Sequence, residues 1–180
     1  MKIIGIIQAR TGSKRFPKKV LMPILGKTLL EHMVERVKKS KYLDEIWIAT
    51  TKLQSDNILE SLAKDLKVKV FRGDVNNVLS RFYEISKFSK ADVIVRLTGD
   101  CPLHDGELID KIILCFLNKF KNFDYLSNTV KPTFPDGLDV EVFKFNFLEE
   151  TYQNAKNRID KEHVTTYMHK NFSKKNNDRI

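Results

Sequence analysis

Short apolar runs alternate with helical patterns from the first residue of the chain. The run from Ile3 to Ile7 is almost continuously aliphatic, as expected for a strand that is buried on both faces. Three later segments have a similar character and predict further strands: Glu45 to Thr50, Val68 to Phe71 and Asp92 to Leu97. The first part of the chain therefore predicts four short, buried strands.

Each of these strands is followed by apolar residues at helical spacing. Thr28 and Glu31 form a capping-box pair, which predicts the start of the first helix. Alternation of strand and helix, repeated four times, predicts an α/β fold with a mostly parallel sheet flanked by helices. The four helical patterns cover Thr28 to Lys39, Ile58 to Leu66, Val78 to Ile85 and Leu108 to Leu117.

The alternation changes after Asn122. The segment from Asp124 to Ser127 predicts a short strand, Thr129 to Gly137 a loop, and Leu138 to Phe145 another strand. Two helices are expected next, over roughly Asn146 to Lys156 and Asp160 to Lys170. Because no linker or repeat interrupts the chain, we expect a single domain over residues 1–172 and a frayed polar tail over residues 173–180.

Composition narrows the class of protein. A chain of 180 residues supports a hydrophobic core, and 42% apolar with 31% charged residues excludes a disordered chain. The net charge of +9 favours an anionic partner. The two cysteines, Cys101 and Cys115, argue against a disulfide framework and a zinc ribbon. The short apolar start is neither a signal peptide nor a membrane span, so we expect a cytoplasmic protein without membrane insertion.

The loop after the first strand is strongly basic. In parallel sheets, the loop at the carboxyl end of the first strand commonly binds ligands. Gly12 lets backbone amides approach an anion, and Ser13 adds a hydroxyl donor. Three cations lie in the same loop: Arg10, Arg15 and Lys19. The pattern is neither the Walker nor the dinucleotide motif. We predict a phosphate-binding loop, with a solvated basic loop as the alternative.

Carboxylates follow two later strands. Asp100 comes after the fourth strand, at the same sheet edge as the basic loop, where Mg²⁺ could lie between it and a polyphosphate. The alternative for Asp100 is a turn residue before Pro102. Asp139 and Glu141 alternate along the last strand and so share a face, either as a solvent-facing edge or as a pair that binds a cation and hydroxyls.

Several motifs, in order, resemble one enzyme family. The segment from Ile6 to Leu21, IIQARTGSKRFPKKVL, resembles the opening of the cytidylyltransferases that activate sugar acids as CMP derivatives, such as the acylneuraminate and 3-deoxy-manno-octulosonate synthetases. The resemblance is nearest to the branch called spore coat polysaccharide biosynthesis protein F. Further motifs similar to this branch are Val70 to Gly73, Asn77 to Tyr83, Val95 to Leu103, Tyr125 to Thr129, Pro135 to Phe143 and Glu162 to Thr165.

The resemblance implies a Rossmann-like nucleotide-diphospho-sugar transferase fold, a nucleotidyltransferase domain over residues 1–172, CTP as the donor and Mg²⁺ as the cofactor. It implies that Arg10, Lys19 and Asp100 are catalytic and that Asp139 and Glu141 face the acceptor sugar. Asp100 and Asp139 would ligate the metal, and Arg81 would lie near the cytosine. The positions that would bind CTP are Ala9, Arg10, Gly12, Ser13, Arg15, Lys19, Arg81, Thr98 and Gly99.

One feature departs from the family pattern. The resembled enzymes continue beyond the position of Ile180 with a segment similar to VDTPED, whose first aspartate completes the metal site in the sugar-acid enzymes. We therefore expect either a shortened chain or a substitution of that ligand by Asp139 and Glu141. We also expect these 180 residues to bind CTP and Mg²⁺ but to turn over slowly.

These observations lead to one functional hypothesis and two rivals. We expect a cytidylyltransferase that transfers CMP from CTP to a sugar, expected to be acidic, with release of pyrophosphate, for surface polysaccharide biosynthesis. The rivals are a glycosyltransferase of related fold and a non-catalytic basic module that binds nucleic acid or other anions. The expected partners are CTP and a small sugar rather than nucleic acid. The oligomeric state stays open, with a homodimer among the arrangements considered.

Overall fold

A six-stranded sheet forms the centre of the computed structural model, which describes residues 1–13, 16–130, 132 and 134–175. The four strands predicted first run parallel to one another, whereas the last two strands of the chain are antiparallel: β8 (Glu141–Lys144) to β6 (Val93–Thr98), and β7 (Tyr125–Ser127) to β8. This confirms the predicted α/β class with a mostly parallel sheet. In spatial order the strands are β5 (Lys69–Gly73), β4 (Glu45–Thr51), β1 (Ile3–Gln8), β6 (Val93–Thr98), β8 (Glu141–Lys144) and β7 (Tyr125–Ser127).

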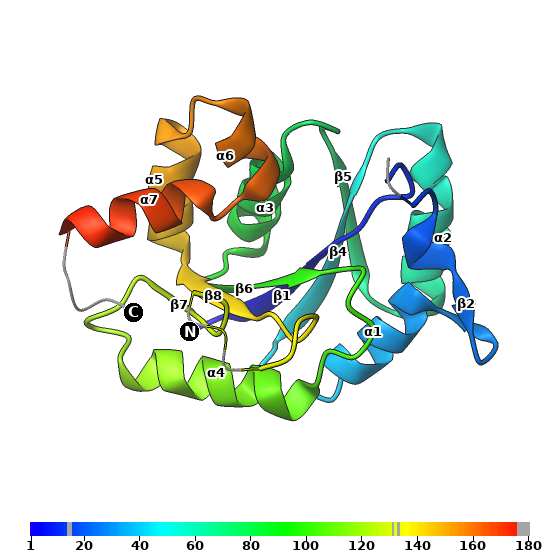
Figure 1. The fold of residues 1–180 in the computed structure, drawn as a ribbon, viewed down its shortest axis with the longest axis horizontal. Helices are drawn as coiled ribbons and strands as arrows, with labels where there is room; N and C mark the ends of the chain where they lie inside the picture. Colours follow the sequence, from blue (N-terminus) through cyan, green and yellow to red (C-terminus); the bar gives the residue numbers. More distant parts are fainter. Residues whose placement is uncertain (14–15, 131, 133, 176–180) are drawn as a thin grey trace.

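Helices cover both faces of this sheet (Figure 1). Each face is sealed by the apolar side of its helices, as the helical spacing predicted. On one face lie α1 (Leu29–Val37), α2 (Asn57–Asp65) and α4 (Gly106–Asn118). On the other lie α3 (Val78–Ser89), α5 (Phe145–Asn154), α6 (Arg158–His163) and α7 (Thr166–Lys175). No helix in the described ranges is both long and apolar enough to cross a membrane.

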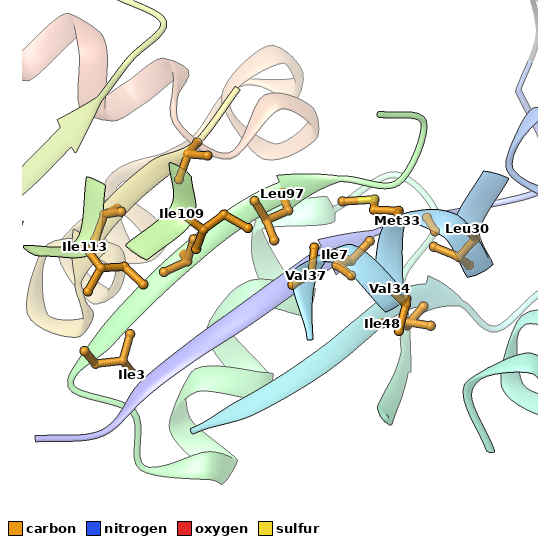
Figure 2. Packing of buried hydrophobic residues seen from close by; sticks show 14 of the residues in the cluster. Ile3, Ile7, Leu30, Met33, Val34, Val37, Ile48, Leu97, Ile109 and Ile113 are labelled. Atoms are coloured by element: carbon orange, nitrogen blue, oxygen red, sulfur yellow. The ribbon is translucent and has the colours of Figure 1, made fainter. Parts of the chain in front are cut away.

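The central strand β1 is buried on both faces. Ile3 and Ile7 pack in the cluster under α1 and α4, whereas Ile4 and Ile6 pack in the cluster under α3 and α5. Figure 2 shows Ile7 close to Val34 and Val37 of α1, within the first of these clusters. The run is continuously aliphatic because successive side chains of a strand point to opposite faces and both faces of β1 are buried, as the sequence predicted.

The capping box predicted at the start of α1 is confirmed. The side chain of Thr28 accepts a hydrogen bond from the Glu31 amide, and the Thr28 amide donates to the Glu31 carboxylate at 2.6 Å. A short hairpin before α1, made of β2 (Pro23–Ile24) and β3 (Lys27–Thr28), was not predicted. Two 3₁₀ helices, Lys19–Leu21 and Gln54–Asp56, were also not predicted from the sequence.

Three element boundaries in the second half of the chain differ from those predicted. The helix expected over residues 160–170 is two helices, α6 and α7, because the backbone of Val164 turns into the positive-φ region at φ 57°. Helix α7 continues to Lys175, so the first three residues of the expected frayed tail are helical. Residues 176–180 lie outside the described residues. Strand β8 also begins three residues later than expected, at Glu141.

Candidate active site

The carboxyl ends of β1 and β6 meet at the start of the basic loop. Gln8 and Thr98 are partners in the parallel register, and the Gly99 amide donates to the Gln8 carbonyl at 2.9 Å. A Cβ atom on Gly99 would lie only 2.8 Å from that carbonyl oxygen and 2.9 Å from the Ala9 Cβ. Only glycine fits this close approach, which holds the segment leading to Asp100 beside the basic loop.

A buried carboxylate anchors the basic loop. Asp56 accepts hydrogen bonds from the Thr11 amide at 2.8 Å and from the Thr11 hydroxyl at 2.6 Å, and its second oxygen accepts one from Thr51. Burial opposes ionisation, but these hydrogen bonds lower the pKa of Asp56. The beginning of the loop is thus fixed to the end of β4, while Gly12 is exposed with open space around it.

Lys19 and Asp100, two residues predicted to be catalytic, form an ion pair. The Lys19 Nζ lies 2.8 Å from Asp100 Oδ2, and the side chains are 40% and 45% exposed. Burial of Asp100 works against its charge, but Lys19 holds the pKa of this carboxyl below its ordinary value. The predicted phosphate-binding cation and the predicted metal ligand therefore lie together at the open edge of the sheet.

The other predicted loop residues differ in their surroundings. The Arg10 Nη2 lies 3.9 Å from a carboxylate oxygen of Glu162 on α6, and Arg10 is partly exposed. The Ser13 hydroxyl accepts a hydrogen bond from the Phe16 amide at 3.4 Å, which stabilises the turn. Arg15, which was predicted to bind the triphosphate, lies outside the described residues.

Arg81 is buried under the same edge rather than exposed on the helix surface. Only 2% of its surface is accessible, and its Nη1 donates to the Ala49 carbonyl at 3.2 Å. Burial, and the nearby positive charge of Arg10, lower the pKa of Arg81 to about 10. This burial excludes a position on the outer face of α3, and the role of Arg81 at a ligand site stays a prediction.

A polar pocket of about 290 Å³ has Thr98, at the carboxyl end of β6, in its wall. Its wall includes three of the predicted residues, Thr98, Asp139 and Glu141, and three that sequence analysis did not assign to a site, Arg96, His163 and His169. The pocket is large enough for a small polar molecule rather than a macromolecular strand.

The two carboxylates predicted to face the acceptor have different environments. Glu141 is 4% exposed and pairs with Arg96, its register partner on β6, while the Tyr125 hydroxyl donates to it at 2.6 Å. Burial alone would raise its pKa, but Arg96, His169 and Tyr125 lower it to about 2. Because its oxygens are already engaged, Glu141 forms a fixed part of the pocket wall.

Asp139 is the more available of these two carboxylates. Burial and the negative charges of Asp136 and Glu141 raise its pKa, so a cation or a hydroxyl donor beside it would be stabilising. Burial, together with the negative charges of Asp100 and Asp139, raises the pKa of the Cys101 thiol. Cys101 therefore stays protonated, as expected for a packing residue rather than a nucleophile.

The carboxylates of Asp100 and Asp139 are ligands of the type that Mg²⁺ prefers. No group of three histidine, cysteine, aspartate or glutamate side chains suited to a metal occurs among the residues that the structure describes. Mg²⁺, however, is often held by one or two carboxylates together with substrate phosphates and water. Asp100 and Asp139, whose charges both act on Cys101, are carboxylates of this kind, and their joint binding of Mg²⁺ stays a prediction.

Sequence analysis missed several residues that build the site. Arg96 and Tyr125 pair with Glu141, His169 joins them on α7, and Asp56 anchors the basic loop. An arginine inside the apolar strand Val93–Thr98 was a usable signal, because a charge there requires a partner. His163 is exposed and lines the pocket, and no signal in the sequence assigned it to a site.

Comparison with known proteins assigns the chain to a family. The family model described as cytidylyltransferase matches residues 4–178. An uncharacterized protein from Methanocaldococcus jannaschii is 51% identical over 173 residues, which cover 95% of this chain and 68% of that protein. The spore coat polysaccharide biosynthesis protein SpsF of Bacillus subtilis is 37% identical over 179 residues, or 92% of this chain and 69% of SpsF.

Comparison with a solved structure leads to the same family. The structure of a cytidylyltransferase from Leptospira borgpetersenii superimposes with a TM-score of 0.93 at 37% identity, covering 97% of this chain and 73% of that one. The resemblance first noticed in the motif around Arg10 and in the segment around Asp100 is thereby confirmed along nearly the whole chain. The chain belongs to the cytidylyltransferase family, whose members are CTP-dependent nucleotidyltransferases.

Proposed function

We propose that this chain transfers CMP from CTP to a hydroxyl group of a small sugar and releases pyrophosphate. The observation that carries the proposal is the exposed Lys19–Asp100 pair, whose Asp100 comes two residues after Thr98, a residue of the polar pocket wall. The basic loop with Lys19 suits a triphosphate, and the polar pocket suits an acceptor with several hydroxyl groups. Membership of the cytidylyltransferase family supports CTP as the donor.

In the proposed reaction, the chain provides charge and orientation. Arg10 and Lys19 neutralise the triphosphate and hold it in line with the pocket, while Asp139 accepts a hydrogen bond from the sugar hydroxyl. The hydroxyl oxygen forms a bond to the α-phosphorus and gives its proton to Asp139, while the bond between the α-phosphorus and the oxygen that bridges to the β-phosphate breaks and pyrophosphate leaves. No covalent intermediate with the protein is required.

Mg²⁺ is proposed as the cofactor. Asp100 and Asp139 would hold the ion together with phosphate oxygens, and a bound Mg²⁺ would neutralise the charge that develops on the transferring group. We expect Asp100→Asn to remove the dependence of CTP affinity on Mg²⁺, because it deletes the exposed carboxylate beside Lys19. Asp139→Asn should instead weaken mainly the binding of the acceptor sugar, because Asp100 and the phosphate oxygens still hold the ion while the hydrogen-bond acceptor of the sugar hydroxyl is lost.

The acceptor class and the cellular role are also proposals. Arg96, His163 and His169 on the pocket wall support an acidic sugar, since each can donate a hydrogen bond to a carboxylate. The name of the Bacillus subtilis relative supports a role in surface polysaccharide synthesis, and we expect the reaction to occur in the cytoplasm.

Pyrophosphate release tests the proposed function. The protein is incubated with Mg²⁺, each of the four ribonucleoside triphosphates, and 3-deoxy-manno-octulosonate or N-acetylneuraminate as trial acceptors. We expect release with CTP and an acceptor only. Nucleoside diphosphate release from a nucleotide sugar, with no pyrophosphate from CTP, would instead indicate the rival glycosyltransferase activity.

A further inference from the structure

The imidazole ring of His169 on α7 is bonded to the sheet beneath it. Its Nε2 lies 2.7 Å from the hydroxyl oxygen of Tyr125 on β7, and this hydroxyl donates to Glu141 Oε1 on β8 at 2.6 Å. Tyr125 and Glu141 are buried, whereas the side chain of His169 is 42% exposed and lines the polar pocket. A chain of hydrogen bonds therefore runs from the protein interior to the pocket wall and ends at His169.

The direction of each bond in this chain follows from the charge at its buried end. Glu141 pairs with Arg96 and is held as a carboxylate, so its oxygens can only accept hydrogen bonds. Burial and the negative charge of Glu141 raise the pKa of Tyr125, which keeps its one hydroxyl proton and uses it in the bond to Glu141. The bond between Tyr125 and His169 therefore takes its proton from His169, so the imidazole is protonated at Nε2.

This arrangement leaves Nδ1 as the ring nitrogen for a ligand. No hydrogen bond joins Nδ1 of His169 to another residue within the described part of the chain. In a neutral imidazole protonated at Nε2, Nδ1 carries a lone pair and can only accept. A charged ring would donate from both nitrogen atoms, but Arg96 already balances the Glu141 carboxylate, so no second cation is required there. The neutral ring offers the pocket an acceptor for a hydroxyl proton, and a carboxylate of the sugar would then meet the donors of Arg96 and His163 on the same wall.

The position of this ring is fixed from several sides. The His169 amide donates to the carbonyl of Thr165, another residue of the pocket wall, at 2.9 Å. The next residue, Lys170, pairs with the buried Asp160 of α6 at 3.0 Å. Together with the bond to Tyr125, these contacts hold the start of α7 in place. An acceptor that is held rigidly in a pocket distinguishes ligands by whether they carry a donor at the matching position.

We propose that Nδ1 of His169 accepts a hydrogen bond from a non-reacting hydroxyl group of the acceptor sugar and so helps to select that sugar. The inference rests on the proposed function, in which the polar pocket holds the sugar. Asp139 receives the proton of the reacting hydroxyl group, whereas His169 orients the sugar through a second hydroxyl group and takes up no proton. A sugar without that second hydroxyl group leaves Nδ1 unpaired and binds more weakly.

The first experiment uses the unaltered protein at pH 8, which favours a neutral imidazole. The ¹⁵N spectra of the ring nitrogens should show His169 protonated at Nε2 and unprotonated at Nδ1. Sugar affinity is measured by calorimetry with Mg²⁺ and a CTP analogue whose methylene bridge between the α- and β-phosphorus atoms prevents turnover. The probes are N-acetylneuraminate and 3-deoxy-manno-octulosonate, each with its series of analogues that lack one hydroxyl group. We expect one such analogue to bind about 3- to 10-fold more weakly than its parent sugar.

Two variants separate sugar binding from support of α7. The amide of His169→Gln reaches as far as Nε2 and can still donate to Tyr125, but it places no acceptor at the position of Nδ1. The shorter amide of His169→Asn does the reverse. We expect His169→Gln to bind the parent sugar about 3- to 10-fold more weakly, to bind the weakened analogue as the unaltered protein does, and to keep its affinity for the CTP analogue. His169→Asn should stay sensitive to the missing hydroxyl group.

A remote histidine provides the matched control. His32 on α1 also uses Nε2 in a hydrogen bond, at 2.7 Å from the Ile24 carbonyl oxygen, and it is not part of the pocket wall. His32→Gln should leave the affinity for both sugars unchanged. Thermal unfolding establishes that each variant is folded, and the ring spectra and the analogue series test the inference even where a variant is not.

The outcomes separate this inference from the proposed function. If the unaltered protein binds neither sugar, the proposed acidic acceptor is overturned, and the inference falls with it. If a sugar binds while His169 is protonated at Nδ1, or if no analogue is weakened, only the inference is overturned. Unchanged sugar affinity in His169→Gln, together with a loss in His169→Asn, would show that His169 only supports α7, which also overturns the inference.

Discussion

Two pairs of opposite charges lie at the same edge of the sheet, and they differ in almost every other respect. Lys19 and Asp100 join a loop to a strand end and are 40% and 45% exposed. Arg96 and Glu141 are register partners on neighbouring strands and are 15% and 5% exposed. The first pair faces solvent at the proposed nucleotide site, and the second forms the wall of the pocket.

The difference shows how burial separates an exchangeable pair from a fixed one. An exposed ion pair contributes little to stability, so a triphosphate can replace Asp100 as the partner of Lys19 at small cost. The buried pair is compensated by further bonds: Gln8 accepts from Arg96 at 3.3 Å, and Tyr125 donates to Glu141. Removal of either partner would leave a charge buried without compensation.

The largest expected effect is on the buried pair. Glu141→Leu should lower the free energy of unfolding by about 3–5 kcal/mol, because Arg96 and the Tyr125 hydroxyl lose their partner in the protein interior. Urea unfolding at pH 7 measures this change. A loss below about 1 kcal/mol would mean that Arg96 can turn to water and that the pocket wall is not fixed.

The second effect concerns binding rather than stability. Lys19→Ala should weaken CTP binding by about 1.5–3 kcal/mol, or roughly 10- to 150-fold, because it deletes a charged donor. The free energy of unfolding should change by less than about 1 kcal/mol. Calorimetry and urea unfolding measure the two quantities. Unchanged CTP affinity in this variant would place the triphosphate elsewhere.

A third prediction extends the comparison to a buried group with no partner. His104 is fully buried, and neither ring nitrogen is bonded to a described residue. Burial lowers its pKa from 6.5 to about 4, although Asp100 acts in the opposite direction. Between these values the unfolded chain binds a proton that the folded chain does not, so stability falls as the pH decreases from 6.5 to 4.

The loss attributed to His104 should reach about 1–2 kcal/mol at pH 5. His104→Leu should remove this part of the pH dependence and leave stability above pH 7 unchanged or increased. Urea unfolding of both proteins between pH 7.5 and 4.5 provides the measurement. Parallel pH profiles for the two proteins would show that another group is responsible.

The smallest effect is expected at the exposed carboxylate. Asp100→Asn should change the free energy of unfolding by less than about 1 kcal/mol, because Lys19 remains hydrated without it. Urea unfolding at pH 7 compares the change in the free energy of unfolding of Asp100→Asn with that of Glu141→Leu. A change at Asp100 as large as that at Glu141 would remove the distinction between the two pairs.

Local and repeating features were predictable from the sequence. The buried strand at Ile3 to Ile7 and the capping box at Thr28 and Glu31 depend on neighbouring residues, and the structure has both. The break at Val164 was not predictable, because a positive φ in a buried β-branched residue reflects tertiary packing rather than local preference.

The site was predictable only in part for a similar reason. Its position followed from strand order, since the basic loop and Asp100 come after parallel strands. The engagement of Glu141 by Arg96 depends on the register of two strands 45 residues apart, and the anchoring of the loop by Asp56 depends on a 3₁₀ helix. Neither relation leaves a local pattern in the sequence.

The location of bound CTP tests the central claim most directly. Titration of the ¹⁵N-labelled protein with CTP and Mg²⁺ would report which backbone amides change. The largest changes are predicted at residues 9–13 and at Gly99 and Asp100, with little change on the exposed face of α2. Changes concentrated instead at the surface lysines of residues 38–41, or changes of equal size with every triphosphate, would contradict it.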